Sequence, residues 1–158
     1  GGKVFITQER VGGGGKLIKI RKFRSMTGND SGEYGEGGTT LRVTKVGRIL
    51  RLTRVDELPQ LWSVILGRLS LIGPRPELPS LVKHYEENIS YYNIRHLIKP
   101  GLSGWAQLYG EHAHHGTSVD QTKNKLSYDL FYIKNREALL DLSIALKTIR
   151  TIISTKGI

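Results

Sequence analysis

The stretch LTRVDELPQLWSVILGRLSLIGPRP, residues Leu52–Pro76, decides how the rest of the chain is arranged. It opens on an acidic pair, Asp56 and Glu57, and ends in a Gly-Pro-Arg-Pro turn around Arg75. Between them, apolar residues recur at i, i+3, i+4, i+7 and i+8, which is the spacing of an amphipathic helix: Leu58, Leu61, Trp62, Ile65 and Leu66. Pro59 suits a first helical turn. The pattern predicts a helix with the acidic pair at its N-terminus.

The acidic pair has two interpretations. Acidic residues are common in a first helical turn, where they cap backbone N–H groups and meet the positive end of the helix dipole. The second interpretation comes from the GPRP turn, because two prolines restrict the backbone on both sides of Arg75. A guanidinium on a stiff turn suits phosphate oxygens. The combination favours a phosphoryl-transfer site, in which the helix N-terminus should keep Asp56 ionised.

Composition bounds the class of protein. The 158 residues, 38% of them hydrophobic, suit one domain with a real core. The absence of cysteine excludes disulfide and thiolate chemistry. The sequence also contains no run of 18 apolar residues, the length that would predict a membrane-spanning helix. The net charge of +10 is uneven, because residues 1–54 hold 12 Lys and Arg against four Asp and Glu. This basic third is compatible with nucleic acid, an anionic membrane, a phosphorylated substrate or plain solvent exposure.

The remaining pattern predicts a helix-rich α+β domain with a small N-terminal hairpin. Residues 3–24 read as two strands joined by a glycine-rich turn, which lacks the Ser or Thr of a phosphate loop. Residues 27–40 read as a surface loop, and residues 103–108 as a short strand. Helical spacing or capping predicts four further helices, over residues 44–53, 77–92, 118–135 and 138–154.

The last predicted helix has two distinct faces. One face is apolar: Leu142, Ala145, Leu146, Ile149, Ile152 and Ile153. The other is polar and basic: Ser143, Lys147, Arg150 and Ser154. Such a helix suits a membrane interface with its cations toward lipid headgroups, or the protein core. We therefore expect several amphipathic helices, some of them interfacial.

Three histidines cluster in the segment YGEHAHHGT, residues 109–117. A zinc site is conceivable there, since His112, His114 and His115 are close in sequence. However, the chain has no cysteine, and only Glu111 is nearby, so a plain surface loop is the preferred interpretation.

Several long motifs resemble one family, the bacterial sugar transferases, or monotopic phosphoglycosyl transferases. They are DELPQLW, LSLIGPRP, KFRSM (Lys22–Met26), KPGLSGWAQ (Lys99–Gln107) and YDLFYIKN (Tyr128–Asn135). They follow the family's order over nearly the whole chain. Two departures are Arg68 and Leu69 after Gly67, in place of an acidic residue and methionine, and Ser63 in place of a common asparagine. The resemblance implies one catalytic domain over residues 1–158, lacking the re-entrant membrane helix that family members carry before it.

The resemblance also implies a reaction. A sugar-1-phosphate passes from a nucleotide diphosphosugar, usually a UDP-sugar, to undecaprenyl phosphate, with release of UMP, at the cytoplasmic face of the bacterial inner membrane. Asp56 is implied as the nucleophile that forms an aspartyl phosphosugar, and Glu57, with Asp56, as a Mg²⁺ ligand. The implied phosphate-binding residues are Lys22, Arg24 and Arg75. Further substrate-binding candidates are Arg95, His96 and Tyr128. The pathway is polysaccharide or glycoconjugate synthesis, with the sugar left open.

The alternative function is a non-catalytic basic module that binds nucleic acid or an anionic membrane. It predicts salt-dependent affinity and no need for Asp56. The chain shows no nucleic-acid motif, and only Phe23 interrupts the basic strands with an aromatic ring. The transferase is therefore the preferred prediction, with an anionic membrane surface and no nucleic acid among its partners.

Overall fold

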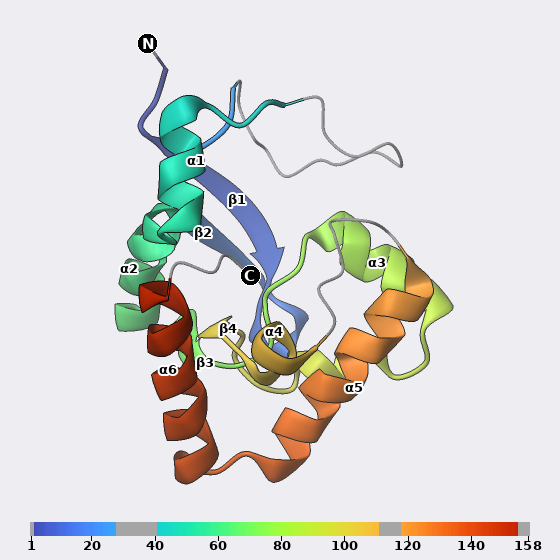
Figure 1. The fold of residues 1–158 in the computed structure, drawn as a ribbon. Helices are drawn as coiled ribbons and strands as arrows, with labels where there is room; N and C mark the ends of the chain where they lie inside the picture. The colour runs from blue at the N-terminus through green and yellow to red at the C-terminus, as the bar shows by residue number, and fades with distance from the viewer. Residues whose placement is uncertain (1, 28–40, 111–117, 155–158) are drawn as a thin grey trace.

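The computed structural model describes residues 2–27, 41–110 and 118–154 (Figure 1). Most of the predicted loop 27–40, and the loop holding His112, His114 and His115, lie outside the described residues. The elements, with 3₁₀ helices labelled η, are β1 (Phe5–Val11), η1 (Gly13–Gly15), β2 (Leu17–Phe23), α1 (Lys45–Leu52), η2 (Val55–Gln60), α2 (Leu61–Ile65), β3 (Ser70–Ile72), α3 (Pro79–Asn88), η3 (Tyr92–His96), β4 (Gly101–Ser103), α4 (Trp105–Tyr109), α5 (Val119–Asn135) and α6 (Ala138–Ile153). The prediction of a helix-rich α+β fold is confirmed.

The N-terminal hairpin forms as predicted. Strands β1 and β2 pair antiparallel, from Phe5 opposite Phe23 to Val11 opposite Leu17. The chain reverses through η1, where Gly14 and Gly15 adopt φ values of 66° and 73° that favour glycine. The alternation of a half-buried sheet turns Ile6 and Ile20 inward. The hairpin thus presents one inward face to the rest of the domain.

Helix α1 fixes the end of the hairpin. The Thr44 side chain caps the helix by accepting a hydrogen bond of 2.9 Å from the Gly47 backbone N–H. A Cβ on Gly47 would lie 1.8 Å from the Ser25 carbonyl oxygen, so the helix packs backbone to backbone against the KFRSM segment. Arg51 Nε also donates to Ser25 Oγ over 3.0 Å. These contacts order the residues that follow Lys22.

The helix predicted after the acidic pair is partly wrong. Residues Val55–Gln60 form the 3₁₀ helix η2, and α2 adds only five residues. The segment starts at Arg54 in the left-handed region (φ 57°), and Pro59 lies inside the 3₁₀ turn. The predicted apolar stripe is exposed, from 42% at Leu61 to 73% at Ile65. Periodicity identifies a common face and not what covers it.

The strand predicted over residues 103–108 is also partly wrong. Strand β4 ends at Ser103, and Trp105–Tyr109 form the short helix α4. Strand β4 pairs parallel with β3, in a two-stranded sheet that the sequence did not reveal because each strand has only three residues. A Cβ on Gly101 would lie 2.2 Å from Gly73 N, so only glycine lets the two strand ends approach this closely. The sheet therefore holds the GPRP turn against the segment Lys99-Pro100-Gly101.

Two apolar clusters form the core. The first joins the hairpin end to α3, η3 and α5 through Val11, Val82, Tyr85, Ile89, Tyr92 and Leu126. The second joins β3, α5 and α6 through Ile72, Tyr132 and Ile144. In Figure 1, helices α3 and α5 lie on one side of the view, and α1, α2 and α6 on the other. Helix α5 contributes Leu126 to the first cluster and Tyr132 to the second, so it connects the hairpin end to β3 and α6.

Helix α6 packs through a narrower face than its pattern suggested. Ile144 is fully buried, whereas Leu142, Leu146, Ile149 and Ile153 are all more than half exposed. For these four residues the core-packing interpretation is wrong, and only Ala145 of the predicted stripe packs against the second cluster. Among the residues that the structure describes, no helix is both long and apolar enough to cross a membrane.

Candidate functional site

Three elements converge on Glu57. Arg75, in the turn after β3, donates from Nη2 to Glu57 Oε1 over 2.9 Å. Lys22, near the end of β2, places its Nζ 3.6 Å from the same oxygen. All three side chains are largely buried, with exposed fractions between 15% and 26%. The structure therefore brings together the acidic pair, one lysine of KFRSM and the arginine of GPRP, which are far apart in sequence.

The two cations set the charge of Glu57. Burial alone raises the pKa of this carboxyl, but Arg75 and Lys22 outweigh burial and hold the pKa at about 2. Burial, together with the charge of Arg75, lowers the pKa of Lys22 to about 8, even though Glu57 acts in the opposite direction. Glu57 is therefore ionised at neutral pH and neutralised by Arg75.

Asp56 differs from its neighbour. Its side chain is nearly buried, at 9% exposure, and burial followed by the charge of Glu57 raises its pKa. The expectation that the helix N-terminus would favour ionisation is wrong in direction, because η2 is a short 3₁₀ turn and desolvation dominates. Within the described ranges, no ion pair or hydrogen bond holds the Asp56 carboxylate. The pair thus consists of a Glu57 carboxylate neutralised by Arg75 and an Asp56 carboxyl whose pKa is raised.

The GPRP turn is held through its carbonyl groups. Pro74 and Pro76 have no N–H to donate, so carbonyl oxygens carry most of the hydrogen bonds that fix the turn, and the Gly73 N–H donates to Ser103 O over 2.8 Å. The donors come from three elements, β4, η3 and β1: Gly101 N to Pro74 O (3.0 Å), Arg95 Nη2 to Arg75 O (2.9 Å), Arg10 Nη1 to Pro76 O (3.4 Å) and Val11 N to Glu77 O (2.9 Å). These hydrogen bonds support the predicted stiffness of the backbone at Arg75, which stays a prediction.

A small pocket adjoins Lys22 and Arg75. Its lining residues come from the hairpin, η2, the GPRP turn and β4: Arg10, Ile20, Lys22, Gln60, Arg75, Pro76, Gly101 and Leu102. Arg10 and Gln60 were not among the predicted site residues. Arg10 lies on the inward face of β1, in step with Ile6 and Gln8, and a basic residue at that register was the signal that could have revealed it.

The other predicted site residues are placed differently. Arg24 is half-buried two residues beyond Lys22, and Tyr128 is half-buried on α5. His96 lies edge-on to the Tyr92 ring, with Nδ1 3.9 Å from Glu86 Oε1. Burial, reinforced by Arg95, lowers the pKa of His96 to about 4. In the described part of the chain, no hydrogen bond or ion pair links Arg24, His96 or Tyr128 to the acidic pair, and their substrate-binding roles stay predictions.

Arg95 is buried at 3% exposure and all of its partners are internal. Nη1 donates to the Tyr92 hydroxyl over 2.7 Å, and Nη2 lies 2.8 Å from Asp129 Oδ2 in an ion pair. Nη2 also donates to the Arg75 carbonyl. The sequence analysis gave Asp129 no role. Its position three residues from both Leu126 and Tyr132, on the buried face of α5, was the signal for an internal partner.

A second ion pair ties α5 to the same turn. Lys125 Nζ contacts Glu77 Oε1, and both side chains are largely buried. Burial raises the pKa of Glu77, but Lys125 and then Arg95 outweigh burial and hold the pKa at about 2. Because Lys125 and Asp129 are four residues apart, they lie on one face of α5.

We expect Glu77 to make the fold acid-labile. Its pKa is about 2 in the folded protein against an ordinary 4.5. Its stabilising effect is therefore present above pH 4.5 and lost as the pH falls toward 2, at most on the order of 3 kcal/mol. Urea unfolding at pH 2.5 to 6 should show a weaker pH dependence in Glu77→Gln. The matched control is Glu9→Gln, at an exposed position of β1, which should follow the wild type. The same dependence of unfolding free energy on pH in all three proteins would contradict the role of Glu77.

The comparisons with known proteins decide the family. A family model described as bacterial sugar transferase matches residues 1–155. The chain belongs to this family. One relative, 43% identical over 99% of this chain and 37% of its own length, is the UDP-N-acetylgalactosamine-undecaprenyl-phosphate N-acetylgalactosaminephosphotransferase of Aeromonas hydrophila. Another is the UDP-glucose:undecaprenyl-phosphate glucose-1-phosphate transferase of Klebsiella pneumoniae, 41% identical over 94% of this chain and 32% of its own length.

A shorter relative shares more of its length with this bacterial sugar transferase. The uncharacterized sugar transferase EpsL of Bacillus subtilis (strain 168) is 38% identical over 100% of this chain and 74% of its own length. By contrast, the chain spans only about a third of the first two relatives. Family membership favours the transferase prediction over a non-catalytic basic module.

The acidic pair of this bacterial sugar transferase offers few metal ligands. Among the described residues, no group of three or more His, Asp or Glu side chains could hold a metal ion. Asp56 and Glu57 are close enough for the charge of one to raise the pKa of the other. Mg²⁺ prefers one or two carboxylates, with phosphate and water oxygens completing its coordination. The donor set therefore fits Mg²⁺ shared with a phosphorylated substrate and does not fit an all-protein metal cage.

Proposed function

We propose that the protein transfers a sugar-1-phosphate from a UDP-sugar to undecaprenyl phosphate and releases UMP. The observation that carries the proposal is the acidic pair, with Glu57 neutralised by Arg75 and Lys22 and Asp56 unengaged within the described residues. This arrangement lies in a chain of the bacterial sugar transferase family. Relatives named as UDP-N-acetylgalactosamine and UDP-glucose transferases support a UDP-sugar as donor.

In the proposed first step, Asp56 acts as the nucleophile. One carboxylate oxygen attacks the phosphorus that carries the sugar, and a P–O bond forms. The bond from that phosphorus to the bridging oxygen breaks, and its electron pair leaves with UMP. The raised pKa of Asp56 makes its ionised form more basic, and hence a better nucleophile, than an exposed aspartate. Its buried position limits the number of orientations from which it can attack.

The neighbouring charges hold the anionic donor. Arg75 contacts Glu57 through Nη2, and a guanidinium fork has further N–H groups for phosphate oxygens. Lys22 supplies a second cation on the same side of Glu57. Asp56 and Glu57 would hold Mg²⁺, which offsets negative charge on a diphosphate when bound. These groups reduce the repulsion between an anionic nucleophile and an anionic substrate.

In the proposed second step, a phosphate oxygen of undecaprenyl phosphate attacks the aspartyl phosphosugar. The new P–O bond gives a polyprenyl diphosphosugar, and the Asp56 carboxylate is regenerated as the leaving group. This step requires the site to lie at a membrane surface, because the acceptor is a lipid. We place the protein at the cytoplasmic face of the bacterial inner membrane.

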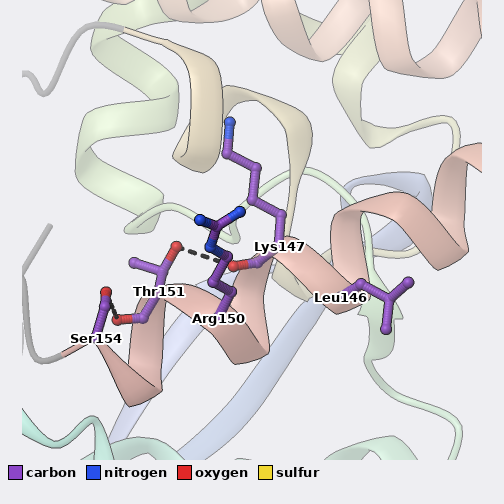
Figure 2. A pocket seen from close by; sticks show the side chains of 5 residues that line it. All are labelled: Leu146, Lys147, Arg150, Thr151 and Ser154. Carbon is purple, nitrogen blue, oxygen red and sulfur yellow. Dashed lines mark hydrogen bonds between the residues drawn. The ribbon is translucent and has the colours of Figure 1, made fainter.

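Exposed apolar side chains support the membrane assignment. They occur on α1, η2, α2 and α6 and include Val46, Ile49, Leu58, Trp62, Ile65, Leu142, Leu146, Ile149 and Ile153. Helices α1, α2 and α6 lie on one side of Figure 1. Large exposed apolar surfaces mark interaction sites. Figure 2 shows Lys147 and Arg150 extending from α6 on one side, with Leu146 pointing away from them. Lys147 lies over the Tyr109 ring, and Arg150 is exposed. An apolar face bordered by cations suits an anionic bilayer surface.

We expect charged substitutions on this surface to weaken membrane binding. Ile65→Asp and Ile149→Asp should each reduce the affinity for vesicles containing anionic lipid by about tenfold, since burying one such side chain is worth about 1.5–3 kcal/mol. Vesicle co-sedimentation measures this affinity. The matched control is Tyr91→Asp, at an equally exposed position after α3, where aspartate tolerates the positive φ of 63°. Equal binding by all variants would contradict the membrane surface.

The proposed reaction is tested by UMP release. The protein, Mg²⁺ and undecaprenyl phosphate in vesicles are incubated with a panel of UDP-sugars. We expect UMP from at least one donor, with the matching sugar phosphate recovered on the lipid. Release of UDP in place of UMP would contradict the proposed function, because it shows cleavage between sugar and phosphate.

A further inference from the structure

The buried ion pair of Arg95 and Asp129 includes neither residue of the acidic pair. Arg95 nevertheless contacts Arg75, the arginine that binds Glu57. Arg95 and Asp129 are 3% and 2% exposed. Tyr92, whose hydroxyl accepts a hydrogen bond from Arg95, is 2% exposed. Replacing a buried ion pair with apolar residues is often neutral or stabilising, so an ion pair is weak evidence for a purely stabilising role. Another role is therefore worth testing for the charges retained here.

The hydrogen bond to Arg75 indicates that role. Arg95 Nη2 donates to the Arg75 carbonyl over 2.9 Å, while the same nitrogen lies 2.8 Å from Asp129 Oδ2. Pro74 and Pro76 flank Arg75 and have no N–H, so this segment has few backbone donors, and hydrogen bonds to its carbonyls contribute to fixing it. Of the four described donors to this turn, Arg95 alone binds Arg75 itself. The direction of the Arg75 side chain follows from that backbone.

We propose that Arg95 is a positioning residue that, anchored by Asp129 of α5 and the Tyr92 hydroxyl, holds the Arg75 backbone so that its guanidinium faces the acidic pair. Arg95 acts through Arg75 and does not touch the substrate. Lys125, four residues before Asp129 on α5, reinforces the arrangement through its ion pair with Glu77, the residue that follows the GPRP turn. Helix α5 thereby sets the position of a catalytic-site arginine that belongs to another element. The catalytic consequence rests on the proposed function.

The first test is a functional double-mutant cycle with the UMP-release assay. The double variant Arg95→Met/Asp129→Leu removes the pair and keeps the core filled. We expect it to lower kcat/KM at least tenfold, yet to lower it less than twofold when Arg75→Met is already present, because the positioned group is then absent. A stabilising role alone predicts the same loss in both backgrounds, and that result would overturn the proposal. Asp120→Asn, on the exposed face of α5, is the matched control and should retain wild-type kcat/KM.

A second variant covers the case in which the double variant fails to fold. Arg95→Lys keeps a cation beside Asp129 but has no second nitrogen to reach both the Tyr92 hydroxyl and the Arg75 carbonyl. We expect the same background-dependent loss from Arg95→Lys.

The second test needs no substrate and so separates this proposal from the proposed function. The NMR resonance of the Arg75 Nε–Hε group is recorded in the wild type, in Arg95→Lys and in the Asp120→Asn control. We expect it to shift or broaden in Arg95→Lys and to stay unchanged in the control. If the wild type releases no UMP, the proposed function fails and the resonance alone decides the positioning role. An unchanged Arg75 resonance in Arg95→Lys would overturn that role.

Discussion

Substituting asparagine for Asp56 is expected to reduce UMP release by at least about 10³-fold, the scale found when a covalent nucleophile is removed. Asparagine keeps the size of the side chain but has no anionic oxygen to attack phosphorus. The variant should fold normally, because Asp56 forms no hydrogen bond or ion pair within the described residues and desolvation raises its pKa. Removing that buried charge could even stabilise the fold slightly. The measurement is the initial rate of UMP release under saturating donor, alongside thermal unfolding.

The control for Asp56→Asn is Asp120→Asn, which changes the same chemistry at an exposed position of α5. Its rate should match the wild type. A rate for Asp56→Asn within tenfold of the wild type would show that another group attacks the donor. Glu57→Gln distinguishes the two acidic residues further. It should impair catalysis and also leave Arg75 and Lys22 without their anionic partner.

Replacing Arg75 with methionine is expected to lower kcat/KM by about 10²–10³-fold, the cost of losing one preorganised charge donor. Lysine at this position should recover only part of the loss, because an ammonium cannot reproduce the planar fork. The structural reason is specific: Arg75 is the residue whose carbonyl accepts a hydrogen bond from Arg95 and whose guanidinium reaches Glu57 over 2.9 Å. Steady-state UMP release over a range of donor concentrations gives kcat/KM.

Arg75→Met also disturbs Glu57, so stability must be separated from catalysis. Losing the guanidinium leaves a largely buried carboxylate with only Lys22 nearby, at 3.6 Å. The double variant Glu57→Gln/Arg75→Met removes the unpaired charge and should recover stability without recovering activity. Arg68→Met, at an exposed arginine after α2, is the matched control. If restoring stability also restored kcat/KM, Arg75 would have only a structural role.

Local pattern predicted much of the fold. The glycine run between two alternating segments predicted the hairpin, and the capping residue Ser118 predicted the start of α5, where it accepts a hydrogen bond from Gln121 N. Both depend on interactions within a few residues. The parallel pairing of β3 with β4 was not predictable in this way, because each strand has three residues and their contact spans about thirty residues of chain. The glycines that permit the contact carry no periodic signal.

The site residues, too, could be predicted where a local motif identified them and not where tertiary contacts decide their role. Asp56, Glu57 and Arg75 were found from the acidic pair and the GPRP turn, and Lys22 through motif resemblance; the structure brings Lys22 and Arg75 into contact with Glu57. The direction of the Asp56 pKa shift was missed, because desolvation depends on tertiary burial and not on position in a helix. The role of the Arg95–Asp129 pair was missed for a related reason. An internal ion pair can be inferred only when both charges are known to lie on buried faces.

The central claim is the covalent role of Asp56, and mass spectrometry of the reacting protein tests it most directly. The protein is incubated with Mg²⁺ and the UDP-sugar that it turns over, without undecaprenyl phosphate, then quenched in acid and digested. We expect the peptide that contains Asp56 to gain the mass of one sugar phosphate, and the gain to disappear when undecaprenyl phosphate is added before the quench. A sugar phosphate on a peptide lacking Asp56, or on no peptide while one equivalent of UMP is released, would contradict the account.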